Sequence, residues 1–183
     1  MAPNSLTIVA VGDLRPDRDN PETIFALNGH VLREADIAFG QLETILSTRG
    51  NPNVGLGSPR RTDPNIISAL GYAGFDLISL AGNHALDFGY DAFFDTIDVL
   101  SKNGIKPLGV GKDLEEARKP VILERNGTRV AFLGYNSILM GSLKGYESGT
   151  PGIVIIPRVT AHHMAALGWT QKSMREFLWQ HSK

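Results

Sequence analysis

The sequence predicts an α/β fold, and three observations support this prediction. Short apolar runs rich in Val and Ile alternate with segments whose apolar residues recur at helical spacing. The apolar runs stop at glycine or at polar side chains, as strands do. Asn126-Gly127 lies between two further strand-like runs and predicts an antiparallel hairpin with a type I′ turn. We therefore expect a mixed set of strands, with parallel strands first and a hairpin later.

The apolar periodicity places each element in the first part of the chain. Pro21 is suited to a helix start, and the apolar residues after it keep helical spacing. Asp63-Pro64 opens a second helix, which Gly71 and Gly74 close, and residues 50–61 are rich in Gly, Pro and Arg, as loops are. We expect strands over residues 6–11, 36–42, 75–81 and 105–110, and helices over residues 21–34, 64–70 and 90–102.

The later part of the chain gives weaker signals. It shows no internal repeat and no clear domain boundary, so we expect one domain over residues 1–183. The expected elements are the hairpin strands 119–124 and 128–135, a loop over 142–151, a brief apolar run over 153–156, and a terminal helix over 159–181.

Composition excludes several classes of protein. The 183 residues are 42% hydrophobic and 20% charged, as in folded globular domains, and the net charge of -1 provides no basic surface for nucleic acid. No apolar run approaches the ~18–20 residues that span a bilayer, and the start lacks the pattern of a signal peptide, so cytoplasm is the expected location. The chain has no cysteine, so any metal must be held by oxygen and nitrogen ligands.

Polar side chains follow three of the expected strands. Asp13 follows the first, Glu43 follows the second, and Asn83 and His84 follow the third. Because the carboxyl ends of parallel strands meet at one edge of a sheet, these side chains are expected to lie close together. Carboxylate, amide oxygen and imidazole form a mixed set of ligands for a divalent ion.

Each of these residues also has an ordinary structural explanation. Asp13 suits a turn or a helix cap, and Glu43 suits a solvated loop. Asn83 and Asp87 can cap a helix, and His84 can be a hydrogen-bonded residue near the core. Their joint position at three strand ends favours function over these separate explanations.

Several blocks of the sequence resemble a known family. In order they are "VAVGDL", "ADIAFGQLET", "GFDLISLAGNHALDFGYDAFFDTIDVL", "GIKPLGVG" and "RVAFLGYNS", and they cover roughly residues 6–140. They resemble the capsule synthesis CapA family (poly-γ-glutamate synthesis, PgsA-type), which belongs to the calcineurin-like metallophosphatase superfamily. The Asn-His-x-x-Asp-x-Gly block with the strand before it is the most specific part of this resemblance.

The resemblance implies a metallo-dependent phosphatase-like α/β/β/α sandwich and a divalent metal centre with one or two ions of Mn, Fe, Zn or Mg. It implies hydrolysis or transfer on an anionic polymer or phosphoester, in a protein linked to capsule or poly-γ-glutamate synthesis. The implied metal ligands are Asp13, Glu43 and Asn83, and His84 is the implied catalytic residue. The residues expected to support them are Asp87 and Gln41, which lie next to these ligands, and Arg60 and Arg61, which would hold the anionic substrate.

The chain also departs from the family pattern. Arg15 stands where the superfamily has a histidine ligand, and Gln41 replaces the asparagine of the Asn-Leu-Glu block. After Tyr135 nothing matches the family's two C-terminal histidine blocks. The pair His162-His163 lies in the expected terminal helix and not at the end of a strand, as the family blocks do. We therefore expect a fold that is incomplete at the C-terminus, with residues 141–183 forming a divergent tail.

Two other functions stay open at this point. A nucleotidase-like phosphoesterase carries a similar Asn-His block followed by an acid and a glycine. A truncated, non-catalytic family member would act as a binding module, as the missing histidine blocks suggest. A missing second half would also expose apolar sheet surface, so we expect self-association.

Overall fold

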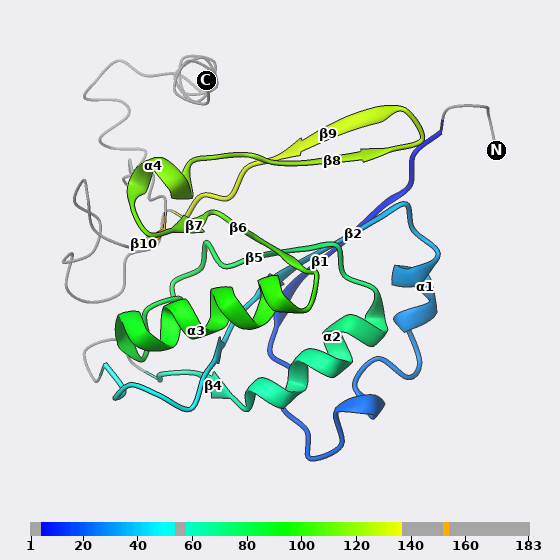
Figure 1. The fold of residues 1–183 in the computed structure, drawn as a ribbon. Helices are drawn as coiled ribbons and strands as arrows, with labels where there is room; N and C mark the ends of the chain where they lie inside the picture. Colours follow the sequence, from blue (N-terminus) through cyan, green and yellow to red (C-terminus); the bar gives the residue numbers. More distant parts are fainter. Residues whose placement is uncertain (1–4, 54–57, 137–151, 154–183) are drawn as a thin grey trace, which may run out of the picture.

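A parallel sheet of four strands forms the centre of the fold (Figure 1). The computed structural model describes residues 5–53, 58–136 and 152–153. The four strands are β1 (Ile8–Leu14), β2 (Ile37–Leu42), β5 (Leu77–Ser79) and β6 (Lys106–Leu108). They lie side by side in the order β1-β2-β5-β6, so the order of these strands in the sheet is the same as their order in the chain.

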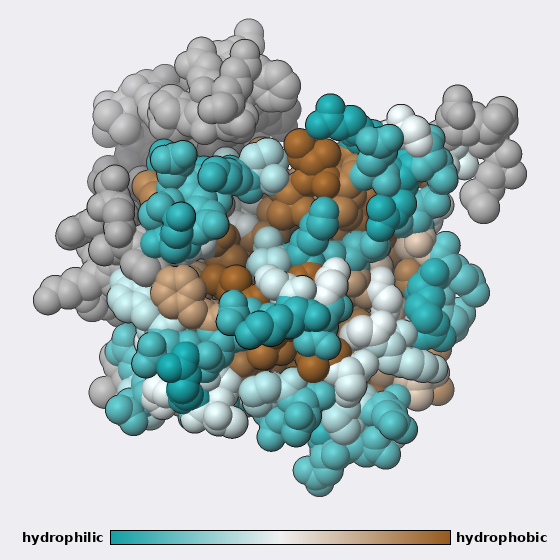
Figure 2. Space-filling view, viewed as in Figure 1, coloured by the Kyte–Doolittle hydropathy of each residue, from teal (hydrophilic) through white to brown (hydrophobic). Residues whose placement is uncertain are grey.

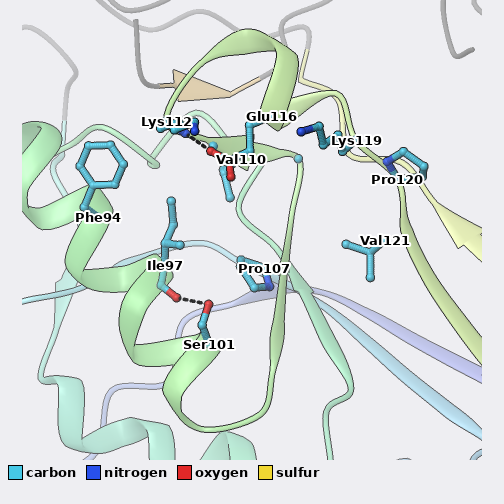
Figure 3. Close-up of a pocket in the computed structure, with 12 residues that line it drawn as sticks. Phe94, Ile97, Ser101, Pro107, Val110, Lys112, Glu116, Lys119, Pro120 and Val121 are labelled. Carbon is cyan, nitrogen blue, oxygen red and sulfur yellow. Dashed lines mark hydrogen bonds between the residues drawn. The ribbon is translucent and has the colours of Figure 1, made fainter.

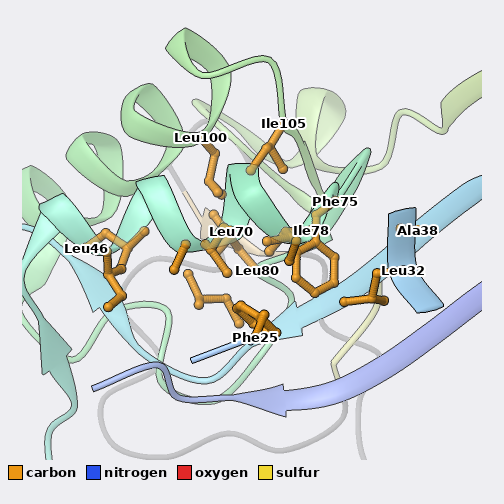
Figure 4. Packing of buried hydrophobic residues seen from close by; sticks show 14 of the residues in the cluster. Phe25, Leu32, Ala38, Leu46, Leu70, Phe75, Ile78, Leu80, Leu100 and Ile105 are labelled. Atoms are coloured by element: carbon orange, nitrogen blue, oxygen red, sulfur yellow. The ribbon is translucent and has the colours of Figure 1, made fainter. Parts of the chain in front are cut away.

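Helices cover one face of this sheet (Figure 1). They are the 3-10 turn η1 (Pro21–Thr23), α1 (Gly29–Arg33), the 3-10 turn η3 (Pro64–Ile66), α2 (Ile67–Ala73) and α3 (Gly89–Lys102). Figure 4 shows how Phe25, Leu70 and Ile78 pack between these helices and the strands. This packing buries the helix-facing side of β2 and β5 and forms the larger of two hydrophobic clusters.

The other face of the sheet is covered by a hairpin. Its strands β8 (Val121–Arg125) and β9 (Thr128–Phe132) are antiparallel, and Leu123 packs with Ile37, Leu77 and Leu108 in the second buried cluster. The rings of Phe39 and Phe132 stack at a centroid distance of 6.1 Å. The described residues therefore form three layers in the order helix, sheet, hairpin, and apolar residues are open to view in the region of the hairpin (Figure 2).

Short elements complete the described part of the chain. Strand β3 (Ile45–Leu46) pairs with β4 (Arg61–Thr62) in parallel, and β7 (Val110–Gly111) pairs with β10 (Gly152–Ile153) in antiparallel orientation. One further helical turn, α4 (Leu114–Ala117), follows β7. The parallel and antiparallel strands of this mixed set thus lie in separate sheets.

The predicted α/β fold class is confirmed, and the hairpin around Asn126-Gly127 is confirmed with positive φ at both turn residues, 52° and 74°. The predicted helix over residues 21–34 is wrong in extent. The chain forms η1 there, then turns, then α1, and the Leu27 side chain is 93% exposed although its spacing placed it on a buried face. Spacing alone cannot show that an apolar side chain points into solvent.

Glycines account for two further differences in boundary, at α2 and at β6. Gly71 lies inside α2, and Gly74 with a φ of 83° ends that helix. Gly109 has a φ of 75° and separates β6 from β7, so the predicted strand over residues 105–110 is two short strands. Strand β5 is also shorter than the predicted 75–81.

Other predictions lie outside the described residues. They are the loop over 142–151, the terminal helix over 159–181, and His162 and His163. The single domain over residues 1–183 stays a prediction for the same reason. Within the described ranges, no helix is both long enough and apolar enough to cross a membrane.

Candidate functional site

The predicted site residues lie at the carboxyl ends of neighbouring strands. Gln41 on β2 is the register partner of Ser79 on β5, so the segments that follow these two strands leave the sheet together. Gly82 lies close to the Gln41 side chain, because a Cβ atom on Gly82 would stand 2.8 Å from the Gln41 side-chain nitrogen. A glycine at this position lets the turn before His84 pass close to β2.

Gln41 links the ends of β1 and β2. Its Oε1 accepts a hydrogen bond of 3.0 Å from the Asp13 backbone N–H, and its Nε2 donates to the Glu43 Oε2 at 3.1 Å. Asp13 has a φ of 51°, in the left-handed region, and the β1–β2 register shifts between Val11 and Leu14. The Gln41 side chain thus holds an irregular strand end.

Glu43 lies between two cationic or potentially cationic side chains. The Arg60 Nη1 donates to the Glu43 Oε1 at 2.8 Å, and the His84 Nε2 lies 3.7 Å from the same oxygen. Both oxygens of Glu43 are therefore bonded, one to Arg60 and one to Gln41. Because the side chain is mostly buried, this pairing matters more than a pair on the open surface would.

Asp87 is the most deeply buried acid of the site, with 0% of its surface exposed. Its Oδ2 lies 2.6 Å from the His84 Nδ1 and accepts a 2.6 Å hydrogen bond from the Arg60 backbone N–H. Its backbone carbonyl accepts another from the Asn53 N–H at 2.7 Å. Asp87 therefore ties the segment before β4 to the turn that carries His84.

Burial raises the pKa of Asp87, and the hydrogen bonds from the Arg60 N–H and from His84 act against this rise. Among the described residues, Asp87 Oδ1 is buried without a hydrogen-bond partner. In the tautomer in which Nδ1–H of His84 donates a hydrogen bond to an ionised Asp87, the lone pair of the neutral imidazole lies on Nε2. That nitrogen, on the side of Glu43, is the atom that can take or give a proton to a ligand.

The structure brings five of the predicted residues into one connected cluster: Gln41, Glu43, Arg60, His84 and Asp87. Asp13 joins it through its backbone, and its side chain is exposed. Asn83 is half-buried in the same turn, and its side chain makes no hydrogen bond to another described residue. Its role as a ligand stays a prediction.

Arg61 has a different environment. Its guanidinium lies 3.7 Å from the centroid of the Phe88 ring and donates to the backbone carbonyl oxygens of Arg49 and Gly50. These contacts hold the loop after β3. To bind a substrate, the Arg61 guanidinium would have to give up these contacts. Its role in substrate binding stays a prediction.

The side chains of the cluster are of the types that bind a divalent ion, but among the described residues too few of them lie close together to hold one. Carboxylate, amide and imidazole groups are present at the strand ends. In the described ranges, however, no group of three or more His, Asp or Glu side chains lies close enough to hold a metal ion, and both Glu43 oxygens are bonded to protein donors. These residues do not form a metal site by themselves.

The bond between the Arg60 backbone and Asp87 was not predicted from the sequence. Arg60 was singled out for its charge, whereas its N–H is what binds Asp87, 27 residues away. A backbone donor leaves no signal in the residue type, so no pattern in the sequence points to it.

One of the described cavities lies away from this cluster. A cavity of about 320 Å³ is lined by Ile97 and Ser101 of α3, by Pro107, and by Lys112 and Glu116 near α4 (Figure 3). It contains none of the predicted site residues. The carboxylate of Glu116, one of the lining residues, accepts a 2.7 Å hydrogen bond from the Lys112 N–H.

Comparison with known proteins identifies the family. The model of the family "Bacterial capsule synthesis protein PGA_cap" matches residues 7–153, which include every residue of the site. An uncharacterized protein of Sinorhizobium fredii, y4sH, is 33% identical over 144 residues, which are 71% of this chain and 30% of that relative.

Other relatives carry functional names, and two of these are CapA proteins. The PGA biosynthesis protein CapA of Bacillus subtilis is 25% identical over 142 residues, 75% of this chain and 37% of the relative. The capsule biosynthesis protein CapA of Bacillus anthracis is 28% identical over 145 residues, 71% of this chain and 34% of the relative. The chain thus spans about a third of the length of these relatives. The chain belongs to the PGA_cap family of bacterial capsule synthesis proteins, which confirms the family inferred from its motifs.

Proposed function

We propose that this chain supplies part of a metal-dependent hydrolase-type site that acts in the synthesis or processing of capsule polymer or poly-γ-glutamate. Membership of the family and the names of the two CapA relatives support the link to the polymer. One observation supports the site: the His84 imidazole is held between the buried Asp87 and Glu43 at the ends of β5 and β2.

Each residue of the cluster has a role in this proposal. Asp87 orients His84, and His84 gives or takes a proton at Nε2. Arg60 pairs with Glu43 in the ligand-free chain and is the nearest cation for an anionic group of the substrate. Asp13, Glu43 and Asn83 are the proposed ligands of the ion, together with ligands from outside the described residues. A bound divalent ion would supply a polarised water and stabilise negative charge.

Metal binding is the first test. The purified chain is equilibrated with Mn²⁺, and its metal content is measured by mass spectrometry beside two variants. Asp13→Ala removes a proposed ligand, and Asp98→Ala removes an exposed acid on α3 that pairs with Lys102. We expect one or two bound ions in the parent and in Asp98→Ala, and loss of the metal in Asp13→Ala.

The second test is turnover. The Mn²⁺-loaded chain is assayed on a phosphoester and on a γ-glutamyl peptide, with His84→Asn as the inactive variant. We expect a loss of about 10²–10⁴-fold in His84→Asn, the range of general acid–base catalysis. An ion that binds equally well to Asp13→Ala, or a parent without metal and without turnover, would refute the proposal and favour a non-catalytic binding module.

A further inference from the structure

We infer that two copies of this chain pair through β1, the outermost strand of the central sheet, to form a dimer with one continuous sheet. Strand β1 hydrogen-bonds to β2 on one side, and its other side has no strand among the described residues. Figure 4 shows β1 at this edge, beyond β2 and below Phe25. A free strand edge is a template for another strand.

The direction of the backbone groups follows from the contacts with β2. The Ile37 N–H donates to the Thr7 carbonyl at 3.2 Å, so Thr7 faces β2. Because alternate residues of a strand direct their backbone groups to opposite sides, Val9 also faces β2, and Ile8 and Ala10 face away. The outward groups of these two residues are therefore available to an added strand.

The side chains at this edge are apolar on both faces of the sheet. On the helix face, Val9, Val11 and Leu14 line an open groove of about 220 Å³ together with Phe25 and Leu32. If a strand is added to β1, every second side chain of that strand points to the helix face and would enter this groove. The strand that this edge accepts must therefore be apolar on both of its faces.

The hairpin face of the edge and the rim of the groove are also apolar. Ile8, on the hairpin side, is 43% exposed. Val31, which lines the groove, is 48% exposed, and Leu27, in the turn before α1, is 93% exposed. Large apolar side chains gathered in this way along a strand edge indicate contact with another protein surface.

Strand β1 itself meets the requirements for the added strand. Its residues from Ile8 to Val11 are apolar on both faces, and no charge lies between Ser5 and Gly12. Two copies can therefore pair in antiparallel orientation about Ala10 without opposing like charges. The pairing has two-fold symmetry, so the groove of each copy receives Val9 and Val11 of the other.

The symmetric arrangement also covers the exposed residues of α1 and the turn before it. The helices of both copies then lie on the same face of the joined sheet, because a two-fold axis perpendicular to the sheet keeps each face on its own side. Leu27 and Val31 are thereby brought towards their counterparts in the second copy.

The test is the molar mass of the full chain, measured by sedimentation across about two orders of magnitude of protein concentration. Ala10→Pro removes an outward N–H without removing a bond to β2, and Leu27→Lys places a charge in the interface at an exposed position that folding does not need. Ile122→Lys is the control, since Ile122 is exposed to a similar degree as Ile8 but lies on the hairpin.

We expect a dimer for the parent and for Ile122→Lys, and a dissociation constant raised at least about tenfold in Ala10→Pro and Leu27→Lys. Hydrogen exchange provides a second measurement: the amides of Ile8 and Ala10 should become protected as the concentration rises. A monomer at every concentration, or dimers unaffected by Leu27→Lys, would overturn the inference and leave the edge to another segment or partner.

Discussion

At the scale of single residues, Asp87 organises the candidate site. A buried carboxylate is unfavourable without hydrogen bonds, and one oxygen of Asp87, Oδ2, accepts them from the Arg60 backbone and from His84. One acid thereby fixes the orientation of the imidazole and the course of the loop. Glu43 is the second acid of the cluster, and its charge is balanced by Arg60.

Replacing Asp87 by alanine should destabilise the chain. The Arg60 N–H and the His84 Nδ1 would lose their acceptor in a buried place, which costs about 2 kcal/mol in the free energy of unfolding. Urea denaturation measures this cost. Asp91→Ala on the exposed start of α3 is the control, with an expected change within about 0.5 kcal/mol. Equal stability of the two variants would contradict this account of Asp87.

The sequence predicted which residues form the site and that they lie close together. It did not predict which side chains form hydrogen bonds or ion pairs with one another. Gly-Asn-His after a buried strand and Glu43 after another were sufficient to place His84 and Glu43 together, because parallel strands end at one edge. Whether Glu43 would bind a metal or Arg60 depends on where the fold places Arg60, which no periodic pattern in the sequence indicates. Side-chain pairing of that kind is decided by tertiary structure.

At the scale of elements, the predicted strands and helices were most accurate where one face is buried. The helix α3 was predicted over 90–102 and spans Gly89–Lys102, since its apolar residues pack against the sheet. The predicted helix over 21–34 failed because Leu27 is a solvent-exposed residue with the spacing of a buried one. Short pairs such as β3–β4 are held by contacts distant in sequence and have no periodic signal.

The contact between α3 and the loop after β3 should depend on pH. Two hydrogen bonds from the Arg49 guanidinium to Asp95, at 2.9 and 2.6 Å, and one from Ser47 at 2.6 Å hold the pKa of Asp95 below its usual value. A lowered pKa in the folded chain means that this stabilisation is complete above the unfolded pKa of about 3.9 and is lost as the pH falls through the folded pKa.

Asp95→Asn should therefore lower the free energy of unfolding by about 1–2 kcal/mol at neutral pH, and the difference from the parent should shrink towards zero in acid. Denaturant titrations at a series of pH values measure this difference. Asp98→Asn, an exposed acid three residues further along α3, serves as the control and should show little difference at any pH. A constant difference for Asp95→Asn across the series would show that its charge is not the cause.

At the scale of the whole molecule, the hairpin acts as a third layer and not as an appendage. Leu123 is buried with Ile37, Leu77 and Leu108, so the sheet has apolar contacts on both faces. A sheet covered on both faces is the usual environment of parallel strands. The hairpin and the helices should therefore unfold together.

Leu123→Ala tests this coupling. It should cost about 2–4 kcal/mol in unfolding free energy, because it leaves a cavity between the hairpin and the sheet. Ile122→Ala on the exposed side of the same strand should cost less than about 1 kcal/mol. Through the same urea titration, circular dichroism follows the helices, and hydrogen exchange of the β8 and β9 amides follows the hairpin. Transitions that separate in the Leu123→Ala variant, with a parent-like midpoint for the helices, would show that the hairpin folds on its own.

The order of strands in the sheet has a consequence for how the protein is made. The strands β1, β2, β5 and β6 lie in space in the order in which they occur in the chain. As the polypeptide leaves the ribosome from its N-terminus, each new strand meets a neighbour that has already been synthesised. The sheet can therefore grow in one direction during translation, and no strand has to wait for, or be inserted between, strands that arrive later.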